Sequence, residues 1–281
     1  MRIDAHAHGI HAELNENNKR IPPIMSSWRN TDITPAEHVK QHNERGIEKV
    51  LLLDPPEIAF ELKKVFGDFV LPCPQIKIDE SSPDEVASLL ERGACGIKFI
   101  APMRPYGDDS YLPIYEVIRD CRALAVFHTG FLVHEFFDPG GVLARPSWIN
   151  MNYMRPSELD RINRAFPDLK ILIAHFGNPW WDEAWSMIKS NKSIYADMSG
   201  GSAYKKSMNM WKEMFAPNGI LDTKTVSKLC YGADDSMFSP GYFGYQNFLK
   251  FYDDFYEALQ LPEEIRRMID RENVLMLTER K

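Results

Sequence analysis

Five residues of metal-ligating type stand at the ends of short apolar runs in this sequence. His6 and His8 are two residues apart near the start of the chain, and His128, His175 and Asp234 each directly follow an apolar run. Residues two apart on a β-strand face the same side, so both histidines of the first pair can reach one ion. Imidazole nitrogens with a carboxylate suit zinc, and also manganese or iron, and leave a position for water or substrate. A single histidine of this kind is more often a satisfied core residue, but five in equivalent places predict a divalent-metal site.

The runs that precede these residues have the length of β-strands. Eight such runs are present, at Arg2–His6, Lys49–Leu53, Phe69–Cys73, Cys95–Ile100, Leu124–His128, Lys170–His175, Ser193–Asp197 and Lys228–Ala233. Helical patterns fall between them, near residues 56–66, 113–122, 157–165, 180–190, 204–215, 242–258 and 262–271. Capping boxes at Thr34 and Ser82 begin two more helices, with Gly46 and Gly93 as their C-caps. This alternation predicts a parallel sheet with crossover helices.

A closed barrel explains how residues so far apart in sequence form one site. The C-terminal ends of all strands of a parallel barrel meet on one face, where catalytic residues gather. We therefore predict an α/β fold of the TIM (β/α)8 barrel type, rather than the open doubly wound sheet that gives the same alternation. The 281 residues suit a single domain over 1–281, with an extra C-terminal helix near 262–271. The long connections 9–33 and 129–155 are expected to cover the site.

Composition limits the classes of function. A formal charge of −7 without a basic cluster argues against nucleic acid as a partner. No window approaches the roughly 20 apolar residues of a membrane span, and no signal peptide is evident, so we expect a cytoplasmic protein without a membrane partner. Four cysteines lie far apart and are expected to be reduced thiols: Cys73, Cys95, Cys121 and Cys230. A homodimer is expected on base rates alone.

The ordered set of motifs resembles the amidohydrolase superfamily, and within it the amidohydrolase-related branch, also called amidohydrolase 2, which includes decarboxylases and lactone hydrolases. The resemblance spans nearly the whole chain, through the segments 3–8 (IDAHAH), 96–99 (GIKF), 127–130 (FHTG), 174–181 (AHFGNPWW), 195–200 (YADMSG) and 231–234 (YGAD). It implies that His6, His8, His128 and Asp234 ligate one divalent metal ion, with zinc preferred over manganese or iron. It also implies that His175 orients or deprotonates the attacking water or the substrate.

These roles lead to a prediction of function. Metal-bound water has a lowered pKa, His175 is suited to general acid/base catalysis, and Asp234 can also shuttle a proton. We predict a metal-dependent hydrolase that cleaves a lactone, amide or ester bond of a small organic molecule. Non-oxidative decarboxylation of an aromatic or enoic acid is the close alternative, and a non-catalytic metal-binding barrel is the third interpretation. TatD-like nucleases also begin with His-x-His, but they have a glutamate ligand mid-chain where this sequence has Lys98 or apolar residues.

Four further residues are candidates for binding the substrate: Lys98, Arg104, Arg145 and Trp148. Binuclear superfamily members carry a carboxylated lysine on the fourth strand, where Lys98 stands, but its Gly-Ile-Lys-Phe context resembles the mononuclear branch. A buried ammonium paired with a carboxylate is the alternative interpretation of Lys98. Arg155 and the aromatic residues of the same loops are weaker candidates for the pocket. His38 and His42, at i and i+4 of one helix, are expected to be exposed.

Overall fold

All strands in the described part of this chain pair in parallel. The computed structural model describes residues 1–9, 34–132, 149–200, 203–238 and 245–280. Its strands are β1 (Arg2–His8), β2 (Ile47–Leu52), β3 (Val70–Pro72), β4 (Gln75–Ile76), β5 (Gly96–Phe99), β6 (Leu124–His128), β7 (Lys170–Ala174), β8 (Ile194–Asp197), β9 (Leu229–Cys230) and β10 (Asp235–Ser236). They pair in the orders β10-β1-β2-β3 and β4-β5-β6-β7-β8-β9. Each of the eight predicted runs therefore contains a strand.

Two interrupted strands join these sheets into a barrel. β3 and β4 are successive pieces of one strand, which pairs with β2 through its first piece and with β5 through its second. β9 and β10 are likewise pieces of one strand, which pairs with β8 and then with β1. Between these last two pieces, the amide of Asp234 donates to the carbonyl of His6 at 2.7 Å. The ring of strands confirms the predicted TIM barrel.

Alternation of side chains along the strands separates an inner core from an outer one. The outer face of each strand packs on the helices, as Ile97 and Phe99 of β5 do. The inner apolar cluster consists of Ile3, Ala5, Leu51, Leu53, Cys73, Cys95, Leu124, Val126, Leu172, Cys230, Val274 and Leu277. His128 follows Leu124 and Val126 at two-residue spacing, so its ring also faces the barrel interior. The inner core thus fills the barrel below the predicted metal site.

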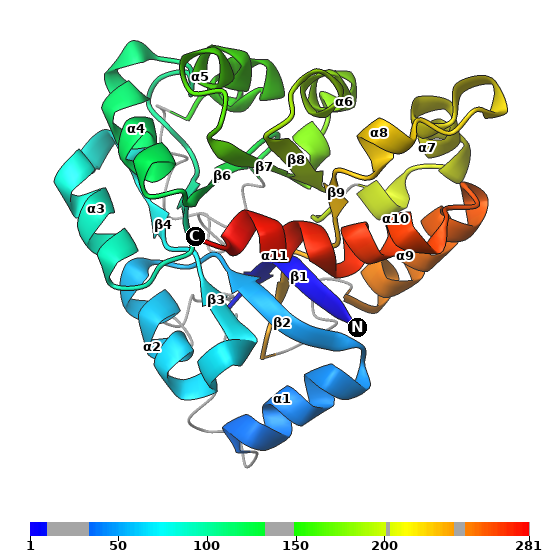
Figure 1. Cartoon of the computed structure of the whole chain (residues 1–281), viewed down its shortest axis with the longest axis horizontal. Helices are drawn as coiled ribbons and strands as arrows, with labels where there is room; N and C mark the ends of the chain where they lie inside the picture. The colour runs from blue at the N-terminus through cyan, green and yellow to red at the C-terminus, as the bar shows by residue number, and fades with distance from the viewer. Residues whose placement is uncertain (10–33, 133–148, 201–202, 239–244, 281) are drawn as a thin grey trace, which may run out of the picture.

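The helices surround the ring of strands in Figure 1. They are α1 (Pro35–Glu44), α2 (Pro56–Phe66), α3 (Pro83–Glu91), α4 (Leu112–Asp120), α5 (Leu159–Ala165), α6 (Trp181–Ser190), α7 (Met208–Phe215), α8 (Thr223–Val226), α9 (Tyr245–Ala258), α10 (Glu263–Arg267) and α11 (Asn273–Thr278). Both predicted capping boxes are present, at Thr34 with Glu37 and at Ser82 with Glu85. No helix of the described residues is both long enough and apolar enough to cross a bilayer.

The C-terminal helix closes the end of the barrel where the strands begin. A π-helical segment, Met268–Glu272, joins α10 to α11, so the helical region extends beyond the predicted 262–271. Val274 and Leu277 of α11 belong to the inner apolar cluster. Asn273 donates to the carbonyl of Leu229, at the start of β9, with a distance of 2.7 Å. In Figure 1 the red α11 crosses the strands at this end, leaving the opposite end for the candidate site.

His38 and His42 are buried, so the prediction that they are exposed is wrong. Their relative exposures are 7% and 2%. The Nε2 atom of His42 lies 2.8 Å from the carbonyl oxygen of Met237 and 3.2 Å from Nε2 of His38. The rings of Phe66, Phe69 and Phe238 surround the pair. The two histidines do lie on one face of a helix, as their i, i+4 spacing predicts, but this face of α1 is turned toward β10 rather than toward solvent.

Candidate metal centre

The five candidate ligands lie at one end of the barrel. His6 and His8 are on β1 and His128 ends β6, while His175 follows β7 and Asp234 follows β9. His6, His128 and His175 are buried, and His8 and Asp234 are partly buried. The imidazole rings of His6 and His175 are 4.5 Å apart, and those of His128 and His175 are 4.6 Å apart. These residues were predicted to meet because each stands at the C-terminal end of a strand (the strand-end rule), and the structure brings them together.

Three of these side chains direct ligand atoms at one point. Nε2 of His6 is 3.3 Å from Oδ1 of Asp234, and Nε2 of His8 is 3.2 Å from the same oxygen. Together these three residues form a group whose ligand atoms lie close enough for a single metal ion. Imidazole nitrogen and carboxylate oxygen are also the donor types that zinc accepts.

Carboxylates behind the two rings determine which nitrogen carries the proton. Oδ2 of Asp197 lies 3.1 Å from Nδ1 of His6, and Oδ1 of Asp54 lies 3.4 Å from Nδ1 of His8. A carboxylate only accepts hydrogen bonds, so when the two Nε2 atoms and Asp234 share a cation, each ring keeps its proton on Nδ1 and donates it to its outer carboxylate. Both Nε2 lone pairs then face the Asp234 carboxylate. Such convergence of acceptors fits a cation, with the outer carboxylates orienting its ligands.

The pKa values of the two histidines differ because their surroundings differ. Burial and the charge of Lys98 lower the pKa of His6 to about 3, so this ring is neutral and able to ligate. Burial also lowers the pKa of His8, but hydrogen bonds to Asp234 and Asp54 outweigh it and raise this pKa to about 9. A proton on His8 therefore satisfies Asp234 when no cation is bound. That proton must leave when a metal binds.

Asp234 and His175 both adopt left-handed backbone conformations, with φ values of 61° and 62°. For residues other than glycine this region costs on the order of 1–3 kcal/mol and is concentrated at functional sites. Hydrogen bonds hold both residues there: the amide of His175 donates to Oδ1 of Asp197 at 2.9 Å, and that of Asp234 donates to His6. Burial opposes ionisation of Asp234, but interactions with His6, His175 and His8 hold its pKa well below the usual range.

His128 is connected to the His6–His8–Asp234 group through the ring of His175. Its Nδ1 atom is 3.1 Å from Nε2 of His175. Its Nε2 atom is buried and has no hydrogen-bond partner within the described part of the chain. Burial and the neighbouring charge of His175 hold the pKa of His128 well below its usual value, so the ring is neutral. A neutral, buried and unpartnered imidazole nitrogen fits a fourth metal ligand.

Lys98 points into the barrel from β5, because its neighbours Ile97 and Phe99 face outward. Its side chain is buried at 1% exposure. The Nζ atom has no hydrogen-bond partner among the described residues, so the expected pairing with a carboxylate is not observed there. Burial lowers the pKa of Lys98 to about 8, and the more distant charges of Asp197 and Asp234 act in the opposite direction.

Arg104 and Arg155 are not part of this cluster. Arg104 is exposed and donates to Oγ of Ser110 at 2.9 Å. Arg155 forms an ion pair with Glu183 and lies over the ring of Trp180, 4.9 Å from its centroid. Arg145 and Trp148 lie outside the described residues, as do the loop histidines His11 and His134.

Three residues of the site were missed as candidates from the sequence. Asp197 ends β8 and contacts His6, and Asp54 directly follows the strand-like run Lys49–Leu53 and contacts His8. Both obey the same strand-end rule as the predicted ligands, so that rule was a sufficient signal. Ser199 lies two residues beyond β8, and its hydroxyl contacts His6 at 3.1 Å. No spacing signal distinguishes Ser199 from other loop serines.

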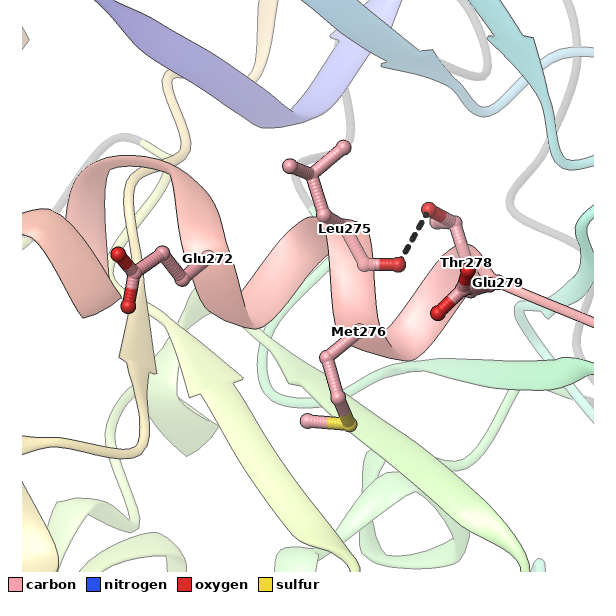
Figure 2. Close-up of a pocket in the computed structure, with 5 residues that line it drawn as sticks. All are labelled: Glu272, Leu275, Met276, Thr278 and Glu279. Atoms are coloured by element: carbon pink, nitrogen blue, oxygen red, sulfur yellow. Dashed lines mark hydrogen bonds between the residues drawn. The ribbon is translucent and has the colours of Figure 1, made fainter.

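A hollow beside the C-terminal helix is remote from this centre. Figure 2 shows it on α11, lined by Glu272, Leu275, Met276, Thr278 and Glu279, with the Thr278 hydroxyl 3.3 Å from the Leu275 carbonyl oxygen. Because α11 covers the end where the strands begin, this hollow and the histidines lie at opposite ends of the barrel.

The chain belongs to the amidohydrolase family. The family model described as Amidohydrolase, of the amidohydrolase-2 branch, matches residues 3–273. This match confirms the resemblance found in the sequence motifs. Members of this family include hydrolases and metal-dependent decarboxylases, and the histidine and aspartate groups described above are able to bind a metal. A search of curated proteins finds no match.

Solved structures share the fold at low sequence identity. An uncharacterised TIM-barrel protein from Bordetella bronchiseptica is 15% identical, with a TM-score of 0.62 over 98% of this chain and 97% of that one. A 2,6-dihydroxybenzoate decarboxylase from Rhizobium is 13% identical, with a TM-score of 0.61 over 99% and 98% of the chains. A 5-carboxyvanillate decarboxylase from Sphingomonas paucimobilis is 11% identical, with a TM-score of 0.63 over 100% and 99%. At such identities the similarity establishes the fold alone.

Proposed function

We propose that this chain is a metal-dependent hydrolase that cleaves a lactone, ester or amide bond in a small organic molecule through metal-activated water. One divalent ion is held by His6, His8, His128 and Asp234, and zinc is preferred over manganese or iron. The observation that carries the proposal is the convergence of two Nε2 atoms on Oδ1 of Asp234, at 3.3 and 3.2 Å. The Nε2 atom of His128, which is buried and has no hydrogen-bond partner within the described residues, supports His128 as the fourth ligand.

The residues of this chain divide the chemical work. A divalent ion held by His6, His8, His128 and Asp234 would lower the pKa of a bound water toward neutrality and polarise a substrate oxygen. His175 serves as general acid/base, and its pKa is lowered mainly by burial, which favours a neutral ring able to accept a proton. Asp234 serves as a second proton carrier, since its Oδ2 lies 4.0 Å from Nδ1 of His175. Asp197 and Asp54 keep the His6 and His8 rings in place.

The second candidate is non-oxidative decarboxylation of an aromatic or enoic acid. Two of the solved structures with this fold are decarboxylases of aromatic acids by name. The buried Nζ of Lys98, which has no hydrogen-bond partner among the described residues, offers a positive charge to a substrate carboxylate or phenolate. In this reaction, the proton carried by His175 or Asp234 goes to the substrate carbon instead of to a leaving group.

A paired substrate assay separates the two reactions. Protein loaded with zinc or manganese is tested on a panel of lactones, esters and amides, and on aromatic and enoic acids with measurement of released CO₂. We expect hydrolysis that is lost after chelation, restored by the metal, and absent in His8→Ala. Metal-dependent CO₂ release without hydrolysis would favour the second candidate. Activity that survives both chelation and His8→Ala would contradict the metal-dependent proposal.

A further inference from the structure

The Ser199 side chain connects three groups of the candidate site. Its Oγ lies 3.0 Å from Nδ1 of His175 and 3.1 Å from Nδ1 of His6, and it also hydrogen-bonds to Oδ1 of Asp197. The Ser199 amide donates to the same carboxylate oxygen at 3.0 Å. Ser199 is 2% exposed, so water does not compete freely for these contacts. A hydroxyl in this position constrains where its neighbours carry their protons.

The acceptors around Ser199 determine the tautomer of His175. The hydroxyl proton goes to the Asp197 carboxylate, which only accepts, and the oxygen lone pairs are left for ring N–H groups. The backbone carbonyl oxygen of Ser199 lies 3.3 Å from Nδ1 of His175. A carbonyl oxygen cannot donate, so Nδ1 of His175 carries a proton. In the neutral ring, the lone pair of His175 is therefore on Nε2.

The tautomer of His175 determines that of His128. Nε2 of His175 lies 3.1 Å from Nδ1 of His128, and an acceptor there requires the His128 proton to be on Nδ1. The lone pair of His128 is then on Nε2, which is the buried atom without a partner among the described residues. The contacts form a chain from Asp197 through Ser199 and His175 to His128. Its result is an Nε2 lone pair on His128 without a hydrogen-bond partner among the described residues, on a ring whose centroid lies 4.6 Å from that of His175.

We propose that Ser199 is a positioning residue that fixes the tautomer of His175 and, through it, that of His128, so that Nε2 of His128 is free to ligate the metal. This inference rests on the proposed function, because it takes His128 as a ligand. Gly200 supports the arrangement: its φ is +83°, and a Cβ there would lie 2.6 Å from Nδ1 of His175. The His175 ring thus fits between a hydroxyl and a residue without a side chain.

The test compares Ser199→Ala with Ser199→Thr, which retains the hydroxyl. Ser193→Ala is the matched control, because Ser193 also uses its hydroxyl, donating to the Pro167 carbonyl at 2.7 Å. It lies just before β8, whereas Ser199 lies just after it. Zinc affinity is measured by chelator competition, and ring tautomers are read from long-range ¹H–¹⁵N NMR of the zinc-loaded protein. Outer hydrogen-bond partners of metal ligands typically contribute about 10–100-fold to metal affinity.

We expect Ser199→Ala to bind zinc about 10–100-fold more weakly and to show a mixture of Nδ1–H and Nε2–H forms of His175, because only the longer contact to the Ser199 carbonyl, at 3.3 Å, remains, with Ser199→Thr restoring both properties. Ser193→Ala is expected to match the wild type. Wild-type affinity and spectra in Ser199→Ala would overturn the inference while leaving the metal site intact. The wild-type spectrum is a test that needs no variant, since a His175 proton on Nε2 also overturns it. Failure of the wild type to bind zinc, manganese or iron at all would instead reject the proposed function.

Discussion

Two groups of buried histidines in this molecule have different surroundings. At the candidate metal centre, the Nδ1 atoms of His6 and His8 face carboxylates, and their Nε2 atoms face Asp234. On α1, His42 contacts His38 and the carbonyl oxygen of Met237, inside a group of phenylalanine rings. Both groups are buried, and both contain histidines at a regular spacing. Outer carboxylates, rather than burial or spacing, therefore distinguish the ligand group from the structural one.

The largest expected effect comes from removing the carboxylate that the site histidines share. Asp234→Ala should lower metal-dependent activity by about 10³-fold or more, because it removes a ligand and a proton carrier together. His42→Leu should leave zinc affinity and turnover unchanged, since its contacts are on α1 and at Met237. Zinc titration and turnover of the two variants test this contrast. Equal losses in both would remove the distinction between the two groups.

His175 provides the next contrast, between catalysis and metal binding. His175→Asn should reduce kcat by about 10²-fold while metal content stays close to that of the wild type, because general acid/base catalysis is worth about this much. An asparagine oxygen can still accept from Nδ1 of His128. Elemental analysis and kcat of the same preparation provide the two readouts. Metal loss in this variant would make His175 a ligand rather than an acid/base.

The outer carboxylates are expected to matter less. Asp54→Asn should weaken zinc binding by about 10-fold to 100-fold, because a neutral amide oxygen replaces the charged acceptor that orients the ring of His8. At saturating zinc, kcat should return to near the wild-type value. Asp79→Asn is a control, because this exposed aspartate contacts Met103 and Tyr111 rather than a histidine. If both variants bind zinc as the wild type does, outer carboxylates do not define the site.

The α1 pair should affect stability against acid rather than activity. Burial is the main cause that lowers the pKa of His42 from 6.5 to about 4, so the folded state binds fewer protons than the unfolded state between these values. Neutral His42 makes its whole contribution to the free energy of unfolding above pH 6.5. This contribution, at most about 3 kcal/mol, is lost as the pH falls toward 4. Urea midpoints at pH 5 and pH 7.5 should therefore differ less in His42→Leu than in the wild type. An unchanged difference would mean that other groups dominate.

The sequence predicted most of the fold because its signals are local. Capping boxes at Thr34 and Ser82 begin real helices, and apolar runs with the correct length become strands. The second and third predicted runs, Lys49–Leu53 and Phe69–Cys73, correspond to β2 and β3. The helical region after residue 262 was predicted too short, because the π-helical segment Met268–Glu272 continues into α11. Periodicity of 3.6 residues does not anticipate such a segment.

The site was predicted in part for a similar reason. Residues at strand ends were found because barrel geometry brings these positions together, but Ser199 lies beyond a strand, and its role depends on which atoms its hydroxyl meets. The burial of His38 and His42 was missed because helical spacing does not say which face packs inward. For Lys98, the sequence suggested a buried ammonium but not that the carboxylates would lie beyond hydrogen-bond reach. Such features depend on side-chain packing between distant segments.

The most direct test of the metal centre is the position of a bound ion. Zinc-edge anomalous diffraction from crystals of zinc-loaded protein should show a single peak bonded to Nε2 of His6, His8 and His128 and to an oxygen of Asp234, at about 2.0–2.2 Å from each. Elemental analysis should then give one zinc per chain. No peak among these residues, or a peak at His38 and His42 instead, would contradict the account.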